Sequence, residues 1–320
     1  MGGSLTKVLT SHKTILNRFV RQSPHLQFIK YYVEVSLNSN HSTECVFKSL
    51  FDIISNMNKL KFIILIIFII LFGIYCTFIE PNILKVKHYT LQDSKLKGVK
   101  IVFASDFHIK PHQQKRLEKV VELINDENPD LVLSVGDFVS GHNEKMTMTI
   151  EDISTELGKV KSKYGFYTTL GNHDGWYGAE RVTKSLQANG IKVLDNESIP
   201  IQINNKTVYI AGIEDLTTGK PQIYQALAKT KTPTILLTHS PDMFVKVPED
   251  VNLTLAGHTH GGQVRIPKFG PIFTASRYGD KYTKGLVEEK GRKLITTTGI
   301  GTSILPIRFN CMPEIVVIEF

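Results

Sequence analysis

The strongest constraint in this sequence is one long apolar segment. From Phe62 to Ile79 the chain reads FIILIIFIILFGIYCTFI, 18 residues without a charged side chain. As a helix this segment is about 27 Å long, enough to cross the hydrocarbon part of a bilayer. A buried core helix of this length would show a polar face, and a cleaved signal peptide would show small residues near Thr77–Glu80. We therefore predict one uncleaved transmembrane anchor over residues 57–80.

The excess positive charge of the chain is confined to its first part. The sequence has 38 Lys+Arg and 30 Asp+Glu, a formal net charge of +8, and all of this excess lies in residues 1–100. Proteins that bind nucleic acid through its phosphates need clustered positive charge on the binding domain. Because residues 101–320 are formally neutral, we expect no nucleic-acid partner. The lysines that flank the anchor are instead expected to face anionic headgroups.

The rest of the chain divides by pattern into three parts. Residues 1–56 have no clean periodicity and no motif, so we predict an N-terminal extension, either disordered or the result of a misassigned start. Residues 81–97 are expected to form a linker. From residue 98 to residue 320, short apolar strands alternate with amphipathic helices, which predicts an α/β domain with covered sheets. The predicted strands are Val99–Ala104, Leu131–Val135, Phe166–Leu170, Val208–Ile213, Thr234–Thr238 and Leu253–Ala256, and the predicted helices are Gln113–Asn125 and Ile150–Lys163.

Five of these strands run directly into acidic, amide or imidazole side chains. In open α/β sheets, ligands bind at the carboxyl ends of the strands, and carboxylate together with neutral imidazole suits Mn, Fe or Zn. Taken singly, each motif has an ordinary explanation, such as a loop hydrogen bond, a helix cap or a buried core histidine. Their occurrence in order after successive strands favours one metal centre. The segments are Asp106-Phe107-His108, Gly136-Asp137, Gly171-Asn172-His173-Asp174, His239 and Gly257-His258-Thr259-His260.

Two of the segments contain pairs of candidate ligands two residues apart. In an extended backbone, the side chains at i and i+2 point to the same side. The spacing therefore predicts that Asp106 with His108, and His258 with His260, each face the metal cluster. The neighbouring glycines are expected to allow sharp turns and to leave room for a phosphate.

Together these motifs resemble the pattern of the calcineurin-like metallophosphoesterases, over roughly residues 98–320. That pattern is D-x-H, G-D, G-N-H-[DE], a lone His and G-H-x-H. The continuation to Gln263, and the tail between Gly299 and Ile315, are similar to a membrane-anchored bacterial branch of the family. This branch includes envelope phosphoesterases and pyrophosphatases that hydrolyse UDP-2,3-diacylglucosamine in lipid A synthesis. The resemblance implies an α/β fold, a four-layer α-β-β-α sandwich of two mixed sheets, preceded by the transmembrane helix.

The resemblance also implies a site with two divalent metal ions. Mn²⁺ is the first candidate for their identity, and Fe and Zn are the alternatives. It assigns Asp106, His108, Asp137 and His260 to one ion, and Asp137, Asn172, His239 and His258 to the other. His173 corresponds to the family's catalytic histidine, and Asp174 is expected to orient it. Arg308 lies beyond these motifs, and the sequence leaves two roles open for it: a contact to a substrate phosphate, or an ordinary surface arginine.

We therefore expect a membrane-anchored phosphoesterase that cleaves a phosphate ester or pyrophosphate bond by attack of a metal-activated hydroxide. The expected substrate is a phosphorylated small molecule or a lipid-linked nucleotide such as UDP-2,3-diacylglucosamine. The alternatives are a broad-specificity phosphomonoesterase or phosphodiesterase of the envelope, and a non-catalytic membrane-bound scaffold that retains the fold. Within about 20 residues of the anchor, more lysines lie on its C-terminal side than on its N-terminal side. This favours a single-pass protein of the bacterial inner membrane with its catalytic domain on the cytoplasmic face.

Overall fold

The computed structural model describes residues 59–141, 143 and 145–320, so the predicted extension of residues 1–56 lies outside the described part. The chain divides into two compact units, the first ending at Leu71 and the second running from Phe72 to Phe320. What the structure describes of the first unit is the greater part of helix α4 (Lys59–Ile74), in which every residue is exposed and no polar face interrupts the apolar side chains.

The apolar helix continues past α4 through a π-helical turn, η1 (Tyr75–Ile79), and a 3-10 turn, η2 (Glu80–Asn82). The whole helix from Lys59 to Asn82 has 24 residues and an 18-residue window with a mean hydropathy of 3.0. Among the described residues it is the one helix long and apolar enough to cross a membrane. Length and composition therefore agree with the predicted anchor.

Two six-stranded mixed sheets form the second unit. The first sheet contains, in order across it, β1 (Lys85–Thr90), β14 (Glu314–Glu319), β2 (Lys100–Phe103), β3 (Leu131–Ser134), β4 (Phe166–Thr168) and β5 (Ile191–Val193). The second contains β12 (Gly285–Glu289), β13 (Arg292–Thr296), β9 (Leu253–Ala256), β8 (Thr234–Leu237), β7 (Lys206–Gly212) and β6 (Glu197–Ile203). The runs of more than two parallel strands are β2 to β5 in the first sheet and β13, β9, β8 and β7 in the second.

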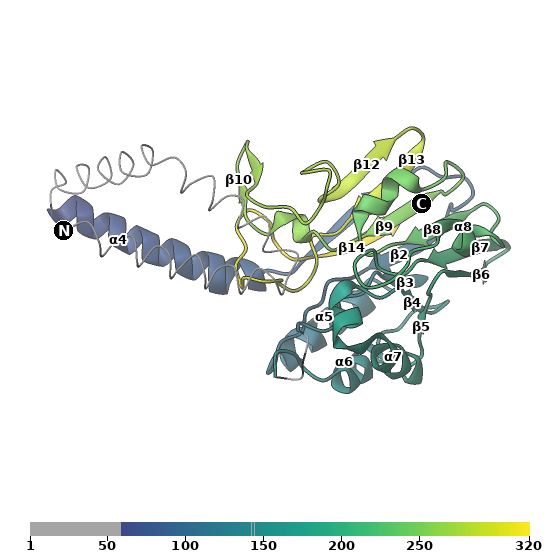
Figure 1. Cartoon of the computed structure of the whole chain (residues 1–320), viewed down its shortest axis with the longest axis horizontal. Coiled ribbons are helices and arrows are strands. Elements are labelled where there is room, and N and C mark those ends of the chain that lie inside the picture. The colour runs from purple at the N-terminus through teal and green to yellow at the C-terminus, as the bar shows by residue number, and fades with distance from the viewer. Residues whose placement is uncertain (1–58, 142, 144) are drawn as a thin grey trace, which may run out of the picture. The chain divides into compact units, whose positions relative to one another are not determined.

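The two sheets pack face to face, and helices cover their outer faces. Alternate residues of each strand show this, because Phe103 of β2 belongs to the core between the sheets whereas Val102 packs against the helices. The helices α5 (Gln114–Asp126), α6 (Ile150–Leu157) and α7 (Asn172–Ala188) lie together beside β2–β5 (Figure 1). The outer face of the second sheet is covered by α8 (Ile223–Leu227) and η3 (Pro241–Lys246). This is the four-layer α-β-β-α arrangement that the sequence predicted.

Two local expectations were wrong. The expected linker of residues 81–97 contains β1, which pairs in parallel with β14 along its whole length. This strand lies at the edge of the sheet with most of its side chains exposed, so its sequence, KVKHYT, lacks the apolar alternation that marks a half-buried strand. The helix expected over Ile150–Lys163 ends at Leu157, and Gly158, a poor helix former, takes the C-cap position.

Candidate metal centre

The carboxyl ends of five buried parallel strands meet at one edge and deliver the predicted site residues to one place. Strand β2 leads to Asp106 and His108, β3 to Asp137, and β4 to the start of α7 at Asn172, His173 and Asp174. Strand β8 leads to His239, and β9 to His258 and to His260, which opens the 3-10 turn η4 (His260–Gly262). All of these side chains are buried except His173 and His258, which are partly exposed.

The first group of ligand atoms surrounds the His108 ring. His108 Nε2 lies 3.0 Å from His260 Nε2 and 3.3 Å from Asp137 Oδ2. His260 Nε2 is also 3.6 Å from Asp106 Oδ1. These four residues are the set that the family resemblance assigned to one ion.

The second group surrounds the His239 ring. His239 Nε2 lies 3.0 Å from Asn172 Oδ1, 3.2 Å from His258 Nδ1 and 3.3 Å from Asp137 Oδ2. The two groups therefore share one oxygen atom of Asp137, which is 3.3 Å from a histidine nitrogen on either side.

The spacing and chemistry of these atoms fit divalent cations. Ligands at about 2.0–2.2 Å from one ion, with angles of about 90–110°, lie roughly 3.0–3.5 Å from each other, as most of these atoms do. His239 Nδ1 is 2.8 Å from the carbonyl oxygen of Val135. It must donate there, which leaves Nε2 of the neutral ring with a lone pair for a metal. Asp106 Oδ2 is buried without a hydrogen-bond partner among the described residues.

The charges of the cluster also favour bound cations. Burial would raise the pKa of Asp137, but His239, His173 and His108 outweigh burial and hold that pKa well below its usual value. Burial likewise opposes protonation of His239, yet the carboxylate of Asp137 raises its pKa to about 10. The site thus attracts positive charge strongly. Burial lowers the pKa of His258 to about 4, which keeps its ring in the neutral, metal-binding form.

The backbone at the site is strained, and this corrects the geometric expectation from residue spacing. Five of the seven candidate ligands have positive φ angles: Asp106 (51°), His108 (41°), Asp137 (55°), His258 (68°) and His260 (50°). Residues other than glycine rarely adopt this conformation, and such strain concentrates at functional sites. The paired ligands therefore do not converge through an extended backbone. His258 in fact faces the second group while His260 faces the first.

Two glycines make room for ligand carboxylates. A Cβ atom on Gly171 would lie 2.2 Å from Asp137 Oδ1, and one on Gly257 would lie 2.1 Å from Asp106 Oδ2. Any side chain at these positions would displace a carboxylate of the cluster. The space that we expected for a phosphate is thus, at these two positions, used by the protein's own acidic groups.

The contacts of Asp174 differ from the orienting role expected for it. Its Oδ2 accepts hydrogen bonds from the backbone N–H groups of Asp137 (2.7 Å) and Gly171 (3.0 Å), and its Oδ1 accepts one from Phe138 (2.9 Å). Burial, and then the charge of Asp137, raise the pKa of Asp174 to about 7. The carboxylate therefore holds the turn that carries Asp137 and also caps the first turn of α7.

His173 stands beside the first group of ligands and has two neighbours that the sequence did not reveal. Its ring packs edge-on against His108, with 4.5 Å between centroids, and against Trp176 at 5.2 Å. Its Nε2 lies 3.5 Å from Ser303 Oγ. Trp176 could have been found, since residues three apart share a helix face. Ser303 comes from a distant loop, and no sequence signal connects it to His173.

Arg308 has neither of the roles that the sequence left open. It is fully buried, and its guanidinium donates to the carbonyl oxygens of Cys311 (2.9 Å), Thr298 (2.7 Å), Gly299 and Gly301. The N–H group of Gly301 in turn donates to the carbonyl oxygen of Asp106 at 2.7 Å. Arg308 is therefore a buried clamp on the loop behind the metal ligands.

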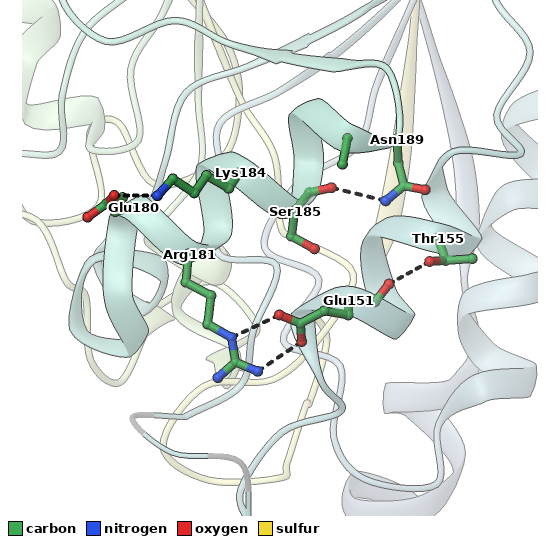
Figure 2. A pocket seen from close by; sticks show the side chains of 8 residues that line it. Glu151, Thr155, Glu180, Arg181, Lys184, Ser185 and Asn189 are labelled. Atoms are coloured by element: carbon green, nitrogen blue, oxygen red, sulfur yellow. Dashed lines mark hydrogen bonds and ion pairs between the residues drawn. The ribbon is translucent and has the colours of Figure 1, made fainter.

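A hollow of about 580 Å³ on the surface between α6 and α7 is a separate feature. Figure 2 shows that its charged side chains pair with each other, Arg181 with Glu151 and Lys184 with Glu180. It is lined by the C-terminal half of α7, whereas the metal ligands lie at the N-terminus of that helix. The clustered ligand atoms, and not this hollow, therefore mark the functional site.

Comparison with known proteins agrees with this geometry. A family model described as calcineurin-like phosphoesterase matches residues 99–262. An uncharacterized metallophosphoesterase of Bacillus subtilis, YkuE, is 32% identical over 253 residues, which cover 76% of this chain and 87% of that protein. The phosphodiesterase YaeI of Escherichia coli is 32% identical, with 69% of this chain and 81% of that protein covered. A Danio rerio protein named transmembrane protein with metallophosphoesterase domain is 28% identical, with 69% and 52% covered. The chain therefore belongs to the calcineurin-like phosphoesterase family and is a metal-dependent hydrolase of phosphoester bonds.

Proposed function

We propose that this chain is a membrane-anchored phosphoesterase with two divalent metal ions in its site. The observation that carries the proposal is the position of Asp137, one oxygen of which lies 3.3 Å from the ligand nitrogens of both His108 and His239. A carboxylate shared in this way suits two neighbouring ions. Asp106, His108 and His260 would complete the first ion's ligands, and Asn172, His239 and His258 the second's.

When bound, two such ions polarise a phosphoryl oxygen and make a water molecule a nucleophile near neutral pH. The protein's own groups do the rest. Helix α7 begins at Asn172, and the N-terminus of a helix favours negative charge such as that of a phosphate. The partly exposed His173 ring, beside His108 and Ser303, is placed to hold a proton for the leaving oxygen. A general acid of this kind typically increases the reaction rate by about 10²–10⁴-fold.

We further propose a substrate that resides at the membrane, with UDP-2,3-diacylglucosamine as the specific candidate and Mn²⁺ as the first metal to test. Three features support this choice: the apolar helix of 24 residues, the Danio rerio relative named as a transmembrane protein, and the Escherichia coli relative named as a phosphodiesterase. The competing function is broad hydrolysis of phosphomonoesters or phosphodiesters in the envelope. The inner membrane and its cytoplasmic face remain the proposed location.

The test uses the full chain in proteoliposomes, loaded separately with Mn²⁺, Fe²⁺ and Zn²⁺. We would measure turnover of UDP-2,3-diacylglucosamine, of bis(p-nitrophenyl) phosphate and of p-nitrophenyl phosphate, with the Asp137→Ala variant as the control for metal-dependent activity. A higher kcat/KM for the lipid nucleotide than for both soluble esters is the expected result. Equal or higher values for the soluble esters would favour the broad-specificity alternative.

A further inference from the structure

The catalytic unit has an exposed apolar surface between its site and the end of the membrane helix. The surface, which we call the apolar rim, consists of exposed side chains from the hairpin β10 (Arg265–Ile266) and β11 (Gly270–Pro271), from the residues just after it, and from the loop at residues 303–306. Its members are Ile266, Phe269, Ile272, Phe273, Ile304 and Leu305. Phe269 and Ile304 are each 87% exposed. Large apolar side chains gathered in this way mark an interaction surface.

The local structure holds these side chains outward. The N–H of Phe269 donates to the carbonyl oxygen of Ile266 at 3.1 Å, closing a turn with Pro267 and with Lys268 at a φ of 70°. This is the pattern of a type II turn, and it presents Phe269 at the tip of the hairpin. Ile304 has a φ of 61°, a strained conformation for a β-branched residue. The rim is therefore a formed surface.

Hydrogen bonds join the hairpin to the loop and fix Ile304 in place. The side chain of Gln263 donates to the carbonyl oxygen of Ser303 at 3.0 Å and accepts from the N–H of Ser303 at 2.7 Å. The N–H of Phe309 donates to the carbonyl oxygen of Gln263, and Phe309 also bridges to Val264. The rim thus spans two segments of the chain that hydrogen bonds join into one surface.

The same loop packs on the end of the apolar helix. The rings of Phe72 and Phe309 meet edge to face with 4.9 Å between centroids, and the N–H of Arg308 donates to the carbonyl oxygen of Cys76 at 2.9 Å. Phe72 precedes Glu80, the first charged residue after the apolar run, by a helical rise of about 12 Å. If the helix spans a bilayer, Phe309 lies at the level of the hydrocarbon, and the rim adjoins it.

From this placement we propose that the apolar rim contacts the bilayer. This contact would place the opening of the active site at the membrane surface. Lys268 and Arg277 are exposed beside the rim, where they suit anionic headgroups. At its other end the rim reaches the site, because Ser303 contacts His173 at 3.5 Å. A lipid substrate could then present its phosphate to the site while its acyl chains stay in the bilayer. The inference rests on the proposed membrane anchor.

The experiment measures tryptophan quenching by brominated lipid in the full chain. The sequence has a single tryptophan, Trp176, which gives a constant background in the parent. We would compare Phe269→Trp and Ile304→Trp with Tyr224→Trp, a position on α8 that is also highly exposed, at 79%. The vesicles contain phosphatidylcholine brominated midway along its acyl chains, together with anionic phosphatidylglycerol. An inserted side chain lies about 5–10 Å into the boundary, so we expect the rim tryptophans to lose about half of their emission and Tyr224→Trp to behave as the parent.

Equal quenching of the rim variants and Tyr224→Trp would overturn the inference. So would a rim tryptophan with blue-shifted, unquenched emission in a cross-linked dimer, because a second copy of the chain would then cover the surface. Flotation of the parent with vesicles separately tests the anchor, and a chain that does not float overturns both proposals. Turnover of bis(p-nitrophenyl) phosphate by the parent tests the phosphoesterase, so its failure is distinguishable from a failure of quenching.

Discussion

Replacement of Arg308 by methionine distinguishes a buried clamp from a phosphate ligand. Arg308 donates to four backbone carbonyl oxygens, and the one on Gly299 has a second donor, the N–H of Glu314. Arg308→Met, which keeps the apolar stem, leaves the other three buried acceptors without that donor. Each unsatisfied buried group costs about 1–3 kcal/mol. At the low end of that range, the three groups together should lower the free energy of unfolding by about 3 kcal/mol.

The assay is thermal unfolding followed by circular dichroism, combined with steady-state kinetics on a soluble phosphodiester. For a unit of this size each kcal/mol shifts Tm by about 2–4 °C, so Arg308→Met should lower Tm by roughly 6–12 °C. KM for the folded enzyme should stay close to that of the parent. The matched control is Arg181→Met, which removes an exposed ion pair with Glu151 and should change stability by less than about 1 kcal/mol.

A rise in KM without a loss of stability would contradict the role of Arg308 as a buried clamp. If Arg308 contacted the substrate phosphate, Arg308→Met would raise KM strongly while Tm stayed within error of the parent. A Tm change no larger than that of Arg181→Met would show that the four carbonyl contacts do not contribute as the structure implies. Metal content should be measured in the same samples. The loop that Arg308 clamps also binds the backbone of Asp106, so weaker metal binding should accompany the loss of stability.

Three further substitutions test the site itself. His173→Ala should keep two metal ions per chain and lower kcat by about 10²–10⁴, measured by metal analysis and steady-state kinetics, and unchanged kcat would contradict its role as proton donor. Asp137→Ala should lose metal and activity together, because both groups of ligands share its carboxylate; an active variant with full metal content would count against the shared ligand. Asp174→Asn can no longer accept from all three N–H groups, so it should lower the free energy of unfolding by about 1–3 kcal/mol in denaturant titration. It should also weaken metal binding about 10–100-fold, and parental metal affinity in this variant would show that the hydrogen bonds of Asp174 do not support Asp137 as a ligand.

The sequence alone determined the chemistry of the site and the type of fold. Residue type and order were sufficient for this, because buried parallel strands are short apolar runs and their carboxyl ends meet at one edge. The nine residues named from the motifs all came together there, from Asp106 to His260. The apolar run from Phe62 to Ile79 was likewise recognisable from its composition as a segment long and apolar enough to cross a membrane.

How those residues converge, and what supports them, depends on packing that the sequence pattern does not show. The paired ligands have a left-handed backbone that spacing could not reveal; at Asp106 and His108 it is accompanied by N–H bonds to the carbonyl oxygens of Gly136 and Asp137, beyond the end of β3. Arg308 is buried, and its guanidinium donates to four carbonyl oxygens between Thr298 and Cys311. β1 is a strand because β14, more than two hundred residues later, pairs with it. For the ligand pair of β2 and for β1 the deciding partner is distant in sequence, whereas for Arg308 it is the fold of its own loop. Local pattern therefore specifies what a residue can do, whereas long-range packing specifies what surrounds it.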